Sequence, residues 1–167
     1  WEQRGVTIEQ DGDFPQSSST TFTVKTTQKQ HFALNLLIPS WAEKASISIN
    51  GKKTSVKVTG KARYHTISRK WKDSDKVQLH LQGGFIIHHL QGDCQTIAIS
   101  YGPMLLAFIE NDKIELQLTE HQLLNNLQAT DASKGIFTLN HNGKQYTLRP
   151  LFDVDDETYS VYVQLKP

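Results

Sequence analysis

The chain has 167 residues and a formal net charge of +1, from 18 Lys and Arg against 17 Asp and Glu. A balance this even excludes long-range attraction to nucleic acid or to an anionic membrane, and no stretch approaches the roughly 20 apolar residues that a membrane helix needs. The single cysteine, Cys94, excludes an intramolecular disulfide and a thiolate metal cage.

Alternation of apolar and polar residues with a period of two dominates the chain. In residues 31–38 one face is apolar and consists of Phe32, Leu34, Leu36 and Ile38. Residues 76–81 alternate in the same way, and shorter alternating runs occur at 22–24 and 46–49. One apolar and one polar face per strand is typical of antiparallel sheets packed on a core.

Turn residues separate these runs at the spacing expected of a sandwich or barrel. Asn50-Gly51 is the strongest of them, because both residues tolerate the positive φ of a tight hairpin turn. It predicts a hairpin between residues 45–49 and 54–58. A second hairpin is predicted between residues 135–140 and 144–148, around Asn142-Gly143.

One segment, Thr119–Leu127, departs from the strand pattern. It places Leu123, Leu124 and Leu127 at helical spacing, and Thr119 and Gln122 have the spacing of a capping box. The sequence therefore predicts an all-β fold, an antiparallel and jelly-roll-like β-sandwich with one short helical excursion. Residues 1–110 are expected to form the main sandwich. Residues 111–167 are expected to complete it or to form a small appended lobe.

Metal and catalytic sites are not indicated by the polar clusters. His88 and His89 would point to opposite faces of a strand and cannot converge on one ion. The acidic cluster at 153–157 could hold Ca²⁺ on a loop but lacks an EF-hand pattern, which favours a solvated turn. Glycoside hydrolysis needs two facing carboxylates, and the acidic residues at 9–13 lie among turn formers. We assign no catalytic, metal or cofactor residue.

Aromatic residues give the alternative of carbohydrate binding. Trp41, Tyr64 and Trp71, if displayed in a row on one sheet face, could stack on sugar rings. The competing interpretation is that Trp41, after Pro39, and Trp71, after a run of basic residues, cap the edge of the core.

Several motifs in a fixed order carry a resemblance to a known family. They are Leu37-Ile38-Pro39-Ser40-Trp41-Ala42, Asn50-Gly51, Tyr64–Ile67 with Arg69–Lys72, Ala98–Ala107 around Tyr101-Gly102-Pro103, and Arg149–Asp153 through Tyr159–Tyr162. In this order they resemble the C-terminal β-sandwich region that follows the helical barrel in family-127 glycoside hydrolases, the β-L-arabinofuranosidase group. Relatives usually have arginine where this chain has Leu37.

The resemblance implies a bacterial parent enzyme of carbohydrate metabolism, periplasmic or secreted rather than cytoplasmic, from which this chain is a piece. It places the family's catalytic glutamate and cysteines in the absent barrel. We therefore expect a non-catalytic accessory domain that supports the helical barrel of the same parent chain or mediates a homodimer. An oligosaccharide is the alternative partner. The Leu37 face and residues 85–87 are the expected contact surfaces.

Overall fold

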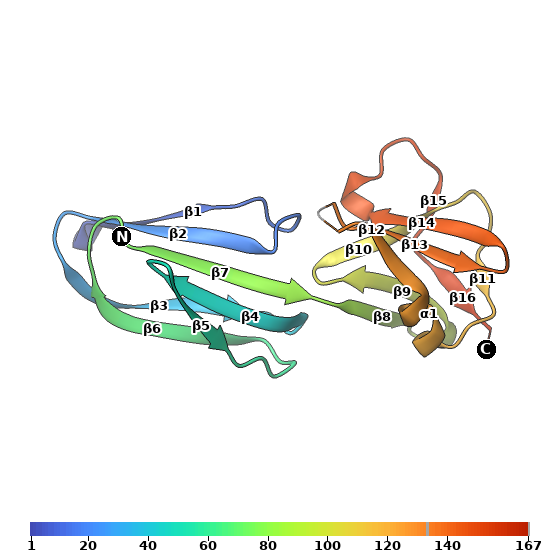
Figure 1. Ribbon diagram of the computed structural model, residues 1–167, viewed down its shortest axis with the longest axis horizontal. Helices are drawn as coiled ribbons and strands as arrows, with labels where there is room; N and C mark the ends of the chain where they lie inside the picture. Colours follow the sequence, from blue (N-terminus) through green and yellow to red (C-terminus); the bar gives the residue numbers. More distant parts are fainter. Residues whose placement is uncertain (133, 167) are drawn as a thin grey trace. The chain divides into compact units, whose positions relative to one another are not determined.

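Antiparallel strands build most of the structure, a computed structural model that describes residues 1–132 and 134–166. The chain divides into two units, Trp1–Gly84 and Phe85–Pro167 (Figure 1). Each unit has its own buried apolar core. The all-β class predicted from the alternation is confirmed. None of the helices in the described residues has the length and apolar content needed to cross a membrane.

The division lies between residues 84 and 85, whereas the sequence predicted a boundary after residue 110. The reason is the pairing of the strands on either side. The strand ending at Gly83 pairs with strands of the first unit, and the strand starting at Phe85 pairs only with the next strand along the chain. Residues 85–110 therefore contribute to the second core and not to the first.

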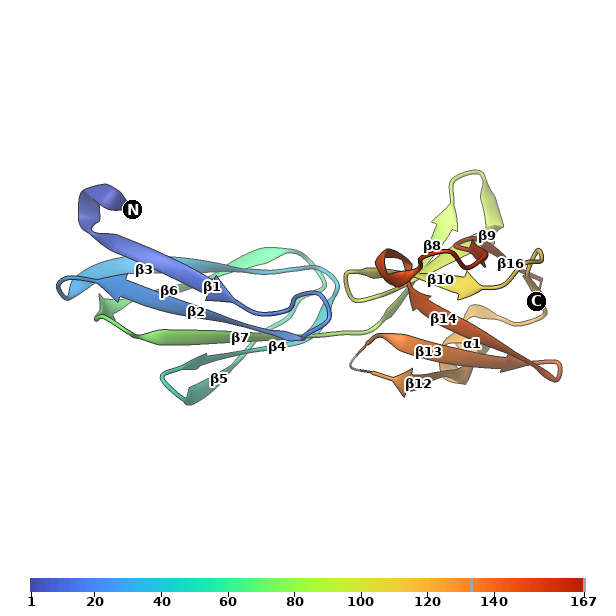
Figure 2. The ribbon, with the colours of Figure 1, turned by 90° about the horizontal axis from the view of Figure 1, so that it is seen from above.

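The first unit is a sandwich of a five-stranded sheet and a two-stranded sheet. Its elements are η1 (Glu2–Arg4), β1 (Val6–Asp11), β2 (Ser19–Thr26), β3 (Gln30–Ile38), β4 (Ala42–Ile49), β5 (Lys52–Val56), β6 (Arg63–Trp71) and β7 (Lys76–Gly83). The five-stranded sheet has the order β1-β2-β7-β4-β5, and β3 pairs with β6 along its whole length (Figure 2). Both sheets contribute side chains to one core, among them Val24, Ile47, Leu79, Phe32 and Trp71.

Alternation along these strands explains why the sandwich forms. In β7, Val77, Leu79 and Leu81 are buried while the intervening side chains face outward. The predicted hairpin is present as β4 and β5, with Asn50 at φ 49° and Gly51 at φ 86°. Glycine suits the second position because a Cβ is strained at positive φ.

The second unit contains one larger sheet and a short helix. Its elements are β8 (Phe85–Leu90), β9 (Asp93–Tyr101), β10 (Met104–Ile109), β11 (Glu115–Leu116), α1 (Glu120–Asn126), β12 (Leu127–Asp131), β13 (Ile136–His141), β14 (Lys144–Pro150), η2 (Leu151–Asp153), β15 (Tyr159–Ser160) and β16 (Val163–Leu165). The second predicted hairpin corresponds to β13 and β14. Among the strands of the described residues in this unit, β11 and β16 run parallel and the other pairs are antiparallel.

The predicted helix is confirmed as α1, together with its capping box. The Thr119 side chain accepts a hydrogen bond from the backbone N–H of Gln122, and the Gln122 side chain accepts one from the backbone N–H of Thr119. Leu123 is completely buried in the second core. A helix of seven residues has little stability of its own, so this contact and the cap hold it.

Candidate functional site

Trp71 lies in the core and cannot bind a ligand at the surface. Its side chain is completely buried, and its Nε1–H donates a hydrogen bond of 3.0 Å to the backbone oxygen of Phe32. The indole also stacks on the Phe32 ring, with centroids 5.6 Å apart. The prediction of a sugar-stacking role is wrong for this residue, and its role is packing.

Trp41 and Tyr64 keep exposed surface but do not form a row with Trp71. Trp41 is half-buried and stacks on Phe14 at a centroid distance of 6.0 Å. Tyr64 is 68% exposed and lies on β6 directly opposite Leu37 of β3, which is also exposed. Because residues 64 and 71 of one continuous strand are separated by an odd number, their side chains must point to opposite faces.

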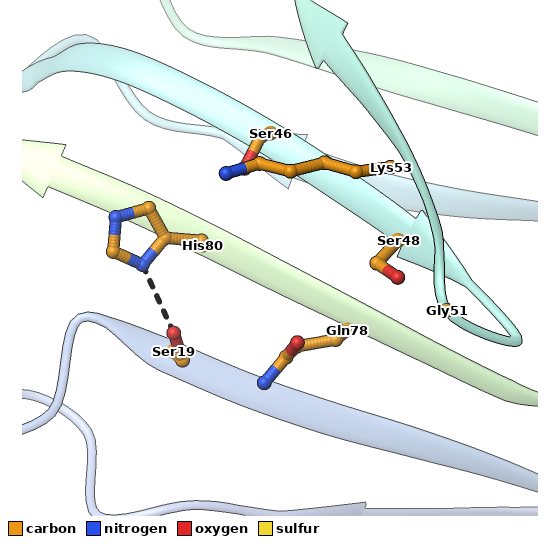
Figure 3. A pocket seen from close by; sticks show the side chains of 7 residues that line it. All are labelled: Ser19, Ser46, Ser48, Gly51, Lys53, Gln78 and His80. Carbon is orange, nitrogen blue, oxygen red and sulfur yellow. Dashed lines mark hydrogen bonds between the residues drawn. The ribbon is translucent and has the colours of Figure 1, made fainter.

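A polar hollow lies on the outer face of the five-stranded sheet, away from the core of the first unit (Figure 3). It has a volume of about 280 Å³. The residues that line it are Ser19 of β2, Ser46 and Ser48 of β4, Gly51 of the hairpin turn, Lys53 of β5, and Gln78 and His80 of β7. They alternate with core residues such as Ile47 and Leu79, which places them on the outward face.

His80 lies between two serines in this hollow. The register pairs it with Ser19 of β2 on one side and with Ser46 of β4 on the other. Its Nδ1 lies 2.9 Å from Ser19 Oγ (Figure 3). The same atom lies 3.2 Å from Ser18 Oγ. These contacts fix the imidazole plane, and the direction of each hydrogen bond depends on the ring tautomer.

Lys53 brings the positive charge to the hollow. The register places it opposite Ser48, and its side chain extends beside Ser46 with the amine toward the His80 side (Figure 3). Ser46 faces outward and yet is only 9% exposed. None of the seven lining residues is acidic, so the lining offers an amine, an imidazole, an amide and hydroxyl groups.

Catalysis by the Ser19–His80 pair has little support in this arrangement. A serine nucleophile needs a base that is itself oriented by a third group, as well as donors for the developing oxyanion. Here His80 uses Nδ1 for two serine hydroxyls, and no carboxylate lines the hollow. The residues are equipped to bind a polar group rather than to cleave a bond.

Asp75 is a buried charge that joins two turns of the first unit. Its side chain is 1% exposed, and Oδ1 accepts a hydrogen bond of 2.8 Å from Asn50 Nδ2. Oδ2 accepts one of 3.1 Å from the backbone N–H of Lys72, and Arg69 Nη2 lies 3.8 Å from it. Burial by itself would raise the pKa of Asp75, but these hydrogen bonds and the Arg69 charge hold it below its ordinary value.

The acidic cluster of the second unit surrounds an arginine. Arg149 Nη2 lies 3.1 Å from Asp153 Oδ2, and Arg149 also pairs with Glu157. A hydrogen bond from the backbone N–H of Asp155 is the main cause that lowers the pKa of Glu157. Two of the carboxylates weighed as calcium ligands thus compensate Arg149, and the cluster has a structural explanation.

The neighbouring histidines of β8 have separate partners. His88 Nε2 lies 2.9 Å from Ser100 Oγ, while His89 Nδ1 lies 3.0 Å from the backbone oxygen of Cys94. His89 Nε2 also lies 3.2 Å from Glu120. The described residues contain no group of three or more His, Cys, Asp or Glu that could hold a metal ion.

The hollow and the Asp75 site were not found from the sequence. The sequence identifies Asn50 only as a turn residue, and the serines of β4 only as the polar side of a strand. Their convergence depends on the order β2-β7-β4-β5, which brings distant segments side by side. Local alternation gives the outward face of each strand but not its neighbours.

A comparison with known protein families finds a match for the first unit. Residues 1–83 match the family described as "Beta-L-arabinofuranosidase, GH127 middle domain". The resemblance indicated by the sequence motifs is thereby confirmed, and the matched region is the one that the family description calls the middle domain. No curated protein is similar enough in sequence to count as a match.

Solved structures share the fold over nearly the whole chain. A protein titled "Glycoside hydrolase" aligns with a TM-score of 0.68 at 16% identity, covering 100% of this chain and 34% of its own. A GH127 beta-arabinofuranosidase aligns with a TM-score of 0.63 at 18% identity, covering 96% and 32%. A GH127 beta-L-arabinofuranosidase from Geobacillus Stearothermophilus T6 gives 0.59 at 18% identity, covering 96% and 31%. This chain thus spans about a third of each of these proteins.

Proposed function

Because residues 1–83 match the GH127 middle domain, we propose that this chain is the non-catalytic β-rich part of a family-127 glycoside hydrolase. Its role is to support a helical catalytic barrel in the same parent protein. The observation that carries the proposal is this family match. The fold that this chain shares with two GH127 structures supports the proposal. The alignment covers 32% and 31% of those proteins, so about two thirds of each lies outside the aligned region.

The carboxylates described above support the non-catalytic part of the proposal. Glu9 pairs with Lys25, Asp153 and Glu157 compensate Arg149, and Asp75 is buried under hydrogen bonds. A glycosidase needs a pair of free carboxyl groups that flank the bond it cleaves, one acting as the acid and the other as the base or nucleophile. These side chains are instead committed to neighbouring cations and amides.

The Leu37–Tyr64 pair is the surface that we propose contacts the barrel. The two side chains lie opposite each other on the outer face of the β3–β6 sheet and are 47% and 68% exposed. Cross-strand neighbours of this kind have Cβ atoms about 5 Å apart, so they form one continuous apolar spot. Burying such a spot against another domain would be favourable, whereas leaving it in water brings no gain.

The test compares the 167-residue chain with its full parent protein. We expect the parent, and not the chain alone, to hydrolyse a chromogenic β-L-arabinofuranoside. Leu37→Glu should lower the melting temperature and the activity of the parent while leaving the melting temperature of the isolated chain unchanged. Thr7→Glu, at an exposed position of β1, is the matched control and should change neither. Hydrolysis by the isolated chain would refute the non-catalytic assignment.

The result for Leu37→Glu also separates barrel support from dimerisation. An equal loss of stability in both proteins would mean that Leu37 matters only within the first unit, which contradicts the contact. A dimer of the isolated chain that Leu37→Glu dissociates would assign the surface to a second copy instead.

Carbohydrate binding remains the second candidate, because Tyr64 and Trp41 keep exposed ring surface. Titration with arabinan-type oligosaccharides should then give a saturable change in Trp fluorescence. Trp41→Ala should abolish the change, and Tyr64→Ala should weaken it. A flat titration would exclude this role and leave the scaffold proposal standing.

A further inference from the structure

The polar hollow of the five-stranded sheet has features that neither barrel support nor packing requires. Four strands contribute polar side chains to one place, and they do so on the face opposite to the core. Ser46 is 9% exposed although it faces outward, so the hollow provides partial shelter from water. A charged or polar group bound there would meet fewer competing waters than on an open sheet face.

The lining groups favour a negatively charged ligand. Lys53 supplies a full positive charge, and the hydroxyls of Ser46 and Ser48 can donate hydrogen bonds. His80 is held through Nδ1 by Ser19, which leaves Nε2 for a ligand. Since none of the lining residues is acidic, nothing in the lining repels an anion.

The size of the hollow and the composition of its lining further limit the class of ligand. The volume of about 280 Å³ lies at the lower limit of the roughly 300–1,000 Å³ that is usual for sites of drug-sized molecules, which favours a small ligand. The seven lining residues include no Trp, Tyr or Phe ring on which a sugar could stack. A small oxyanion fits both observations, because it needs little space and is bound by several converging donors.

We propose that this hollow binds a small oxyanion, the phosphate, sulfate or carboxylate group of a ligand, between Lys53, His80 and the serines of β4. The proposal uses only residues of the first unit and does not depend on the parent enzyme's activity. It also differs in place from the Leu37–Tyr64 surface, which lies on the other sheet.

The experiment is an NMR titration of the ¹⁵N-labelled 167-residue chain at constant ionic strength, with chloride as the balancing anion. Sodium phosphate, sodium sulfate and sodium glucuronate are the three charged probes, and neutral arabinose is the uncharged one. We expect saturable shifts of the backbone amides of residues 46–53 and 78–80 with at least one charged probe. Phosphate or sulfate alone would indicate a tetrahedral ligand, and glucuronate alone would indicate an acidic sugar.

Lys53→Gln and Lys52→Gln form the matched pair of variants. Both remove one positive charge from β5, but Lys53 is opposite Ser48 at the hollow while Lys52 is opposite Ile49 and does not line it. Lys53→Gln should weaken binding roughly tenfold or more, because hydrogen bonds from a charged donor to an anion are the strong ones. Lys52→Gln should leave the affinity within about twofold, since only screened long-range attraction is lost.

Three results would overturn the proposal. The first is the absence of saturable shifts with every charged probe. The second is an equal loss of affinity in the two lysine variants, which would mean non-specific attraction to the surface. The third is a shift of the same amides by arabinose at equal strength, which would show that charge is not recognised. The amide spectrum of each variant confirms that it is folded.

Discussion

Replacing Asp75 by asparagine tests the most heavily buried charge of the first unit. The carboxylate accepts hydrogen bonds from Asn50 Nδ2 at 2.8 Å and from the backbone N–H of Lys72 at 3.1 Å. An asparagine retains one acceptor oxygen but turns an amino group toward one of these donors. One charge-assisted hydrogen bond is lost and a donor is left unsatisfied, so we expect a loss of about 2–3 kcal/mol in the free energy of unfolding.

The assay can observe the first unit selectively. The three tryptophans, Trp1, Trp41 and Trp71, all lie in residues 1–84. Urea unfolding at pH 7 followed by Trp fluorescence therefore reports on this unit. Asp13→Asn, at an exposed turn, is the charge-matched control and should stay within about 0.5 kcal/mol of the unchanged protein. An equally small effect of Asp75→Asn would refute the reasoning.

The dependence on pH has a definite sign. Because the pKa of Asp75 is lower in the folded protein than its ordinary value of 3.8, the ionised carboxylate stabilises the fold at neutral pH. This contribution is lost as the pH falls below about 3.8 and through the folded pKa. The stability difference between the protein and Asp75→Asn should accordingly shrink over that range. A difference that grows on acidification would contradict the assignment.

Substitutions at three further positions test local features. Trp71→Phe should lower the free energy of unfolding by about 2–3 kcal/mol, because it opens a cavity and removes the indole donor from the Phe32 carbonyl. The measurement is urea unfolding followed by circular dichroism. A loss below about 0.5 kcal/mol would be inconsistent with the burial of Trp71. In the same assay, Gly51→Val should lower the free energy of unfolding by about 1–2 kcal/mol, because a β-branched side chain is strained at a φ of 86°. Gly51→Asn should lower it clearly less, because asparagine tolerates a positive φ better. Thr119→Ala should cost about 1 kcal/mol, measured by amide hydrogen exchange at Leu123, whereas Thr119→Ser should retain the cap.

The elements that were predicted correctly are those that local sequence determines. The Asn50-Gly51 hairpin and the capped helix after Thr119 each depend on residues within a few positions of one another. The division between the two units depends on which strands pair across the chain. Gly83-Gly84 resembles the other turns of the sequence, so it does not by itself indicate the boundary.

The alternation along β6 shows why Trp71 was not recognised from the sequence as a core residue. The inward positions of this strand are Arg63, His65, Ile67, Arg69 and Trp71. Its outward positions are Tyr64, Thr66, Ser68 and Lys70. Both sets are largely polar, so hydropathy does not identify the inward face. The odd separation of Tyr64 and Trp71 would have excluded their joint display on one face, had the strand been recognised as continuous.

This polar inner face also explains why Asp75 matters beyond its own hydrogen bonds. Burying a guanidinium in a core is costly unless it is paired. Arg69 is half-buried beside Asp75 and lies over the Trp71 ring at 5.1 Å, so the carboxylate and the indole together compensate its charge. Asp75 therefore links the β4–β5 turn, the start of β7 and the inner face of β6. Asp75→Asn would leave Arg69 without its carboxylate as well as leaving one of the donors of Asn50 and Lys72 unpaired, which is why one substitution at a turn should destabilise the whole first unit.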